Sequence, residues 1–132
     1  TAEELAQEIN SKAGKFDLIY ASEAIEHVTD RQLFAEAIAS MLCPSGTVVI
    51  TTINRSLSAL AFAKFTLEYV IKIVPAGTHD PKKFVKPAQL RAEFENVGIL
   101  LDDVTGFVPT LAGNFRQSGN LAVNYGASGG WL

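Results

Sequence analysis

Residues 46–54 read GTVVITTIN and carry the clearest strand signal in the chain, because β-branched residues fill the stretch. A shorter run precedes it, FDLIYA at Phe16–Ala21, whose nearly continuous apolar character is typical of a buried parallel strand. Between the two runs, Asp30 has the position of a helix N-cap, with apolar residues at helical spacing as far as Leu42. Strand, helix and strand in this order predict two parallel strands joined by a crossover helix.

Further helices and strands flank this unit on both sides. Thr1–Lys12 is predicted as a helix with the residue spacing of a capping box at its start. Pro87–Asn96 is predicted as another, with proline in its first turn. Two more strands are expected at Ile99–Val108 and Leu121–Tyr125. The predicted fold class is α/β, a doubly wound half-sheet that ends in an antiparallel hairpin.

The composition excludes several classes of protein. The chain has 132 residues, 48% of them hydrophobic and 19% charged, which is typical of a globular domain. Eleven basic and 14 acidic residues give a net charge of −3, with no run of either sign. This argues against a nucleic-acid surface, which needs clustered Lys and Arg. The single cysteine, Cys43, excludes an intrachain disulfide and any multi-cysteine metal site.

A polar segment follows the first strand, where a doubly wound sheet places its chemistry. Glu23, Glu26 and His27 are spaced i, i+3 and i+4, so one helical turn would bring them to the same side. Two carboxylates and an imidazole suit a divalent metal. The oxygen ligands favour Mg²⁺, whereas the imidazole favours Zn²⁺, Co²⁺ or Mn²⁺. A polar first turn that supports a helix N-terminus explains the same residues, and the spacing leaves both interpretations open.

The stretch Leu57–Val74 is strongly apolar, but Lys64, Glu68 and Lys72 form one polar stripe along it. The three charged residues make this stretch a poor candidate for a membrane-spanning helix, which needs about 20 residues nearly free of charge. Two interpretations remain: a helix lying in a membrane interface, or a lid helix packed on the sheet with its stripe in water. The pattern alone favours the lid.

The loop that follows, at residues 77–84, is dense in functional groups and reads GTHDPKKF. His79 is a candidate general base, because the unperturbed pKa of imidazole lies near neutrality. The loop is equally explained as a connector whose Thr78 and Asp80 bond the backbone.

Four segments together resemble a known family. FDLIYASEAIEHV, ITTINRS, VPAGTHDPKKFVKP and NLAVNYGA look like the ubiquinone-biosynthesis O-methyltransferases, which use S-adenosylmethionine to methylate polyprenylated catechols. The resemblance runs from about Phe16 to Tyr125. Its most specific parts are the GTHDxKKF string and the long insert, since Glu-His after this strand occurs in many methyltransferases of the fold.

The resemblance implies a role for several residues. Glu23, Glu26 and His27 match the family's metal ligands, and Ser22 matches a position against the methyl donor. Bacterial members usually have Met there, so a contact from Ser22 would use its backbone. The implied cofactors are S-adenosylmethionine and a divalent metal, Mg²⁺ or one of Zn²⁺, Co²⁺ and Mn²⁺. The 57–74 insert matches a membrane-facing segment, in which Lys64 and Lys72 would contact anionic lipid.

The resemblance also implies an organisation. No Gly-x-Gly string precedes Phe16, so residues 1–132 are expected to be the C-terminal part of a Rossmann-like methyltransferase domain, with an amphipathic insert at about 55–84. The first strand would then have an open edge, and we expect the isolated chain to be poorly soluble and inactive.

Partners and location follow from the resemblance as well. The expected partners are a polyprenylated catechol, membrane lipid and other ubiquinone-biosynthesis proteins. The expected location is the matrix side of the mitochondrial inner membrane, or the cytoplasmic face of a bacterial inner membrane. Two alternatives stay open: a metal-independent methyltransferase of the same fold with another small acceptor, and a membrane-associated scaffold without catalysis.

Overall fold

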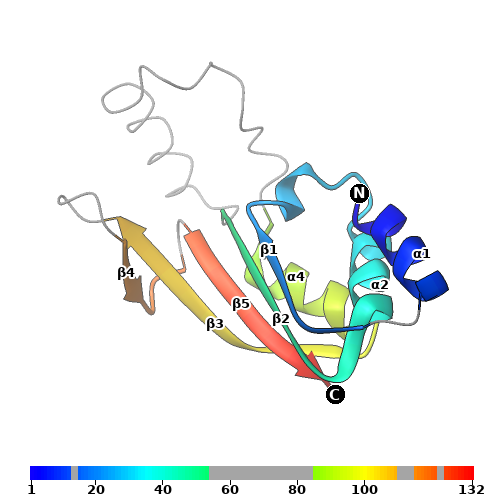
Figure 1. Cartoon of the computed structure of the whole chain (residues 1–132). Coiled ribbons are helices and arrows are strands. Elements are labelled where there is room, and N and C mark those ends of the chain that lie inside the picture. The colour runs from blue at the N-terminus through cyan, green and yellow to red at the C-terminus, as the bar shows by residue number, and fades with distance from the viewer. Residues whose placement is uncertain (13–14, 54–84, 110–114, 122–123) are drawn as a thin grey trace.

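The computed structural model describes residues 1–12, 15–53, 85–109, 115–121 and 124–132. Within them, a mixed sheet has α-helices packed on one of its faces (Figure 1), which confirms the α/β class. The helices are α1 (Ala2–Lys12), the 3₁₀ helix η1 (Ile25–His27), α2 (Arg31–Met41) and α4 (Pro87–Glu95). The strands are β1 (Phe16–Ser22), β2 (Leu42–Ile53), β3 (Ile99–Pro109), β4 (Phe115–Ser118) and β5 (Asn124–Trp131).

The strand order in the sheet is β1-β2-β5-β3-β4. β1 pairs with β2 in parallel, as predicted, and α2 is the crossover between them. β5 pairs antiparallel with both β2 and β3, and β4 pairs antiparallel with β3. The carboxyl ends of β1, β2 and β3 therefore lie along the same edge of the sheet.

The helices begin and end where their sequences predict. The Asp30 side chain accepts a hydrogen bond from the Leu33 backbone nitrogen at 3.0 Å, which caps α2. The Thr1 hydroxyl accepts one from the Glu4 nitrogen at 3.2 Å, at the start of α1. α4 begins at Pro87, and Gly98 follows its end with a φ of 82°, a left-handed conformation that favours glycine.

The core lies between the helices and one face of the sheet. Along β2, Val48, Ile50 and Thr52 are fully buried, so alternate residues of this strand face the helices. Leu90 and Phe94 of α4 are also fully buried in this cluster. Burying these side chains is the main source of stability available to the fold.

The opposite face of the sheet has no helix over it within the described residues. Phe16, Leu18 and Tyr20 of β1 are 42%, 60% and 62% exposed, whereas Ile19 and Ala21 pack against the core. The prediction that residues 16–21 form a buried strand is therefore wrong for one face of β1 in the described part of the chain. β1 and β4 are the two edge strands of the described sheet, and alternate residues of β1 meet solvent.

The last strand lies further along the chain than its predicted position, Leu121–Tyr125. β5 runs from Asn124 to Trp131 and contains three glycines, which have low strand propensity and hide the strand from sequence patterns. A Cβ on Gly129 would stand 1.8 Å from the Leu100 carbonyl oxygen, so this close approach needs glycine. The insert at 55–84, which belongs to the predicted domain organisation, lies outside the described residues.

Candidate functional site

A hollow of about 280 Å³ opens at the carboxyl edge of β1 and β2. It lies near the ends of strands that are far apart in sequence, which is where sheets of this kind bind ligands. Aromatic rings, hydrogen-bonding groups and one carboxylate surround it, so a flat ligand with polar substituents suits it. The lining residues are Tyr20, Glu23, Thr51, Phe107, Asn124 and Tyr125.

The end of β1 is held to β2 by two contacts. The Glu23 backbone nitrogen donates to the Thr51 carbonyl oxygen at 2.9 Å, and the hydroxyls of Ser22 and Thr51 lie 3.1 Å apart. Glu23 has a φ of 49°, a left-handed conformation that is unfavourable for a residue with a side chain. Strained backbone of this kind is concentrated at functional sites.

Glu26 is an acidic side chain inside the protein. Glu26 belongs to η1, and the residue is only 3% exposed. The Thr52 hydroxyl donates to Glu26 Oε2 at 2.8 Å, whereas Oε1 is buried without a hydrogen-bond partner in the described part of the chain. An unpaired buried carboxylate oxygen is costly, so this atom marks a place where a ligand would be stabilising.

The carboxyl groups of Glu23 and Glu26 influence each other. Partial loss of solvent raises the pKa of Glu23, and the negative charge of Glu26 and a hydrogen bond between the two side chains raise it further. Thr51 opposes this shift by hydrogen bonding to the charged form. Neighbouring carboxyl groups of this kind either share a proton or bind a cation.

His27 does not join this pair. Glu23 precedes η1 and has a left-handed backbone, so the regular helical turn that would gather Glu23, Glu26 and His27 is not formed. His27 is exposed, and the described residues contain no group of three or more His, Cys, Asp or Glu side chains placed to hold a metal. Of the three predicted metal ligands, the two carboxylates of Glu23 and Glu26 therefore lie together in the described structure, and His27 lies apart from them. His79, Lys64 and Lys72 lie outside the described residues.

Sequence reasoning missed Thr52 and Tyr125, and also four residues that line the hollow: Tyr20, Thr51, Phe107 and Asn124. Thr52 is fully buried in a strand of mainly apolar residues. A polar residue on a buried face needs a hydrogen-bond partner, and this could have indicated Thr52 from the sequence. Tyr125 is also fully buried, and its hydroxyl donates to the Val85 carbonyl oxygen at 3.0 Å. Its motif, NLAVNYGA, indicated a family resemblance but no role.

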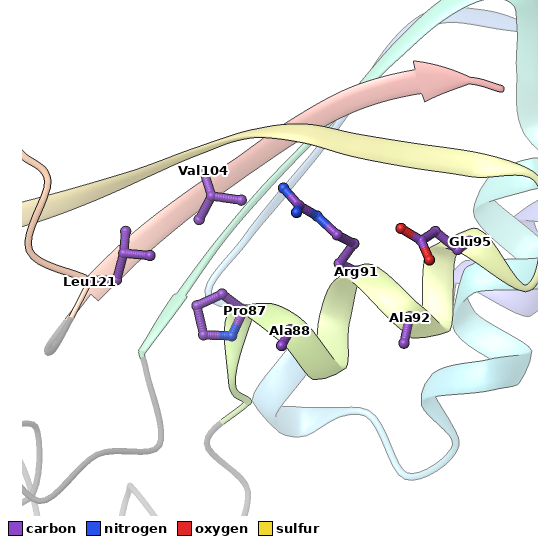
Figure 2. A pocket seen from close by; sticks show the side chains of 7 residues that line it. All are labelled: Pro87, Ala88, Arg91, Ala92, Glu95, Val104 and Leu121. Atoms are coloured by element: carbon purple, nitrogen blue, oxygen red, sulfur yellow. The ribbon is translucent and has the colours of Figure 1, made fainter.

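A second hollow of about 270 Å³ lies between α4 and β3 (Figure 2). Its walls are mainly apolar, and Pro87, Val104 and Leu121 face it. Arg91 reaches from α4 toward the sheet, where its Nε donates to the Leu101 carbonyl oxygen at 2.9 Å. This hollow lacks the paired carboxylates of the carboxyl edge, so the first hollow is the better candidate for chemistry.

Solved methyltransferase structures share the fold of this chain. A methyltransferase of Thermotoga maritima, described as S-adenosylmethionine-dependent and possibly acting on histamine, superposes with a TM-score of 0.65, 14% identity and coverage of 98% of this chain and 60% of that one. An S-adenosylmethionine-dependent methyltransferase of Anabaena variabilis gives a TM-score of 0.64, 14% identity and coverage of 100% and 56%. The sheet is the Rossmann-like sheet of these enzymes.

The sequence comparisons show the family to which the chain belongs. The methyltransferase domain family matches residues 1–102, and the chain belongs to it. A Caulobacter protein named ubiquinone biosynthesis O-methyltransferase is 40% identical over 126 residues, which cover 95% of this chain and 49% of that protein. A Xanthomonas axonopodis protein of the same name is 39% identical, with coverage of 95% and 52%. The chain spans about half the length of these curated relatives.

Proposed function

We propose that the protein containing this chain methylates a catechol hydroxyl of a polyprenylated ubiquinone precursor with S-adenosylmethionine. The relatives named ubiquinone biosynthesis O-methyltransferase support the reaction class, because their similarity extends over 95% of the chain. One structural observation carries the rest of the proposal: the neighbouring carboxyl groups of Glu23 and Glu26 lie at the carboxyl edge, where Glu23 lines an aromatic hollow.

The hollow suits the acceptor ring of this reaction. Tyr20 and Phe107 give it aromatic walls, against which a flat ring packs in offset or edge-to-face arrangements. Thr51 and Asn124 add groups that can hydrogen bond to phenolic oxygens. Binding the ring here would place its hydroxyls beside Glu23 and orient them for transfer.

The carboxylate pair fits a divalent cation. Glu26 Oε1 is buried without a partner in the described part of the chain, and the charge of Glu26 raises the pKa of Glu23. Both features would be relieved by a cation that accepts oxygen ligands, as Mg²⁺ does. A bound cation would lower the pKa of the catechol hydroxyls and so favour the phenolate. We propose Glu23 and Glu26 as its ligands, with His27 remaining a predicted third.

The methyl donor would lie on the side of the hollow next to the end of β1. S-adenosylmethionine supplies a methyl group on a positively charged sulfur, which a phenolate oxygen can attack. The Ser22 hydroxyl already pairs with the Thr51 hydroxyl at 3.1 Å, so its backbone is the part of Ser22 that remains for the donor. The residues of this chain thus bind and align the two reactants, and alignment supplies much of the acceleration.

The test is a methyl-transfer assay on the intact protein, with a catechol carrying a short isoprenoid chain. We expect EDTA to abolish turnover, Mg²⁺ to restore it, and Glu26→Gln to lower it by roughly 10- to 100-fold at fixed metal. Glu36→Gln is the matched control, because Glu36 is an exposed acid on α2 and away from the hollow.

Turnover that is unchanged by EDTA and by Glu26→Gln would overturn the metal assignment. It would favour the second candidate, a metal-independent methyltransferase of the same fold. The exposed position of His27, outside any three-ligand group in the described residues, is the observation that favours this candidate.

We extend the proposal to membrane contact through residues 57–74, on the matrix side of the mitochondrial inner membrane or the cytoplasmic face of a bacterial one. A polyprenylated acceptor resides in the bilayer, so the enzyme must reach it there. No helix in the described ranges is long and apolar enough to cross a membrane. Flotation with anionic liposomes tests the contact, and we expect the double substitution of Lys64 and Lys72 by Glu to weaken it. Equal flotation of both proteins would contradict it.

A further inference from the structure

Two neighbouring hydroxyls lie beneath the carboxyl-edge hollow. Thr52 of β2 is paired in register with Tyr125 of β5, and both side chains are fully buried. The Thr52 hydroxyl donates to Glu26 at 2.8 Å, and the Tyr125 hydroxyl donates to the Val85 carbonyl oxygen at 3.0 Å. The side chains of this cross-strand pair therefore hydrogen bond to the segment that follows β1 and to the segment that leads into α4.

Tyr125 lies between the hollow and the helices. The residue borders the hollow on β5, while its fully buried side chain lies on the side of the sheet covered by the helices, where its hydroxyl donates to the Val85 carbonyl oxygen. Val85 is itself fully buried, and α4 begins two residues later at Pro87. The position of β5 at the hollow is therefore linked directly to the start of α4.

The surroundings keep this hydroxyl a donor. Burial raises the pKa of Tyr125 far above its usual value, and the nearby charges of Glu93 and Glu26 raise it further, against the opposing effect of Arg31. Arg31 and Glu93 form an ion pair at 2.9 Å that joins α2 to α4. The neutral tyrosine thus lies in a buried polar cluster and has one fixed role, that of hydrogen-bond donor to Val85.

We propose that Tyr125 is a positioning residue for the acceptor: through its hydrogen bond to the Val85 carbonyl, it fixes the β5 edge of the hollow, where Asn124 lies, relative to the start of α4. The inference rests on the proposed function for its choice of ligand, an aromatic ring. It assigns Tyr125 to acceptor binding and not to the methyl donor, because Ser22 lies at the end of β1, and β2 separates β1 from β5 in the sheet.

The experiment compares Tyr125→Phe with Ser40→Ala in the intact protein. Both variants lose a hydroxyl that donates to a backbone carbonyl oxygen, but Ser40 bonds to Ala37 within α2 at 2.8 Å, whereas Tyr125 bonds to Val85 before α4. We expect Tyr125→Phe to raise the KM for the catechol roughly five- to tenfold, since one hydrogen bond is lost. The KM for S-adenosylmethionine should not change, and Ser40→Ala should change neither constant.

Equal increases in both KM values, or no increase in either, would overturn the proposal, because a merely structural tyrosine would not separate the two substrates. Hydrogen exchange gives a readout that is independent of activity. The Gln89 and Leu90 amides both donate to the Lys86 carbonyl oxygen at 3.0 Å, and we expect them to exchange faster in Tyr125→Phe, with the amides of α2 unchanged.

These two measurements separate the proposals. A wild-type protein that does not methylate catechols, combined with faster exchange at Gln89 and Leu90 in the variant, would reject the proposed function and keep the link between Tyr125 and α4. Unchanged exchange at both amides would reject the link, whatever the enzyme methylates.

Discussion

The two faces of the sheet are built from the same strands but have opposite surroundings. On β2, Ile50 is fully buried against the helices, while the adjacent Val49 points to the other face and is only half-buried. On β1 the contrast is greater, because Leu18 and Tyr20 are 60% and 62% exposed. Stability in this chain is therefore expected to come from one face, and the other face is available for further contacts.

The largest effect is expected on the covered face. Ile50→Ala should lower the free energy of unfolding by about 2–5 kcal/mol, since it removes fully buried atoms and leaves a cavity. Val49→Ala, the neighbouring change on the open face, should cost less than half as much. Urea denaturation of both variants measures the difference, and equal costs would show that the open face is packed in solution.

The next effect concerns the sheet between the two faces. Gly129→Ala should cost about 1–3 kcal/mol, because its new Cβ would stand 1.8 Å from the Leu100 carbonyl oxygen and the backbone would have to move. Gly119→Ala is the matched control, since a Cβ there meets nothing within 4 Å. Thermal unfolding of both variants tests this, and a harmless Gly129→Ala would mean that β5 pairs less closely with β3 than described.

A smaller effect, dependent on pH, is expected at the carboxyl edge. The pKa of Glu23 is higher in the folded chain than in the unfolded chain, so ionisation destabilises the fold. The wild type should lose stability as pH rises from the unfolded pKa through the folded pKa, and stay lower above it. Glu23→Gln should therefore be more stable than wild type at pH 7 and no different at pH 3, by thermal melting. An equal difference at both pH values would contradict a titration effect.

The smallest effect is expected on the open face. Leu18→Lys should change the free energy of unfolding of the chain by less than about 0.5 kcal/mol, because this side chain is already 60% exposed. It should also reduce self-association, measured by light scattering, since it places a charge on an open edge strand. A loss of several kcal/mol would show that the open face is covered in solution.

Local signals predicted most of the fold. Asp30 caps α2 through its own side chain, Pro87 starts α4, and the β-branched run at 46–54 forms most of β2. Each of these depends on residues close together in sequence. β5 was misplaced because its pairing depends on close approach at Gly129 to a strand about thirty residues earlier, which no local pattern records.

The candidate site was predictable in its residue types and less so in its geometry. The two acids after β1 were identified, and the structure brings their carboxyl groups together. The helical spacing that also included His27 did not apply, because Glu23 adopts a φ of 49° before η1 begins. The contacts of Thr52 and Tyr125 join residues 26 and 40 positions apart, so only the fold reveals them.

The sheet order has a consequence for how the chain acquires its structure during synthesis. Among the described strands, β5 leaves the ribosome last, yet it lies between β2 and β3 and is the only link between them in the described sheet. Val48 pairs with Gly129, so β2 and β3 are joined only after β5 has been synthesised. Such distant pairing slows folding and leaves strand edges exposed in the meantime. We therefore expect the nascent chain to depend on chaperones until β5 has emerged.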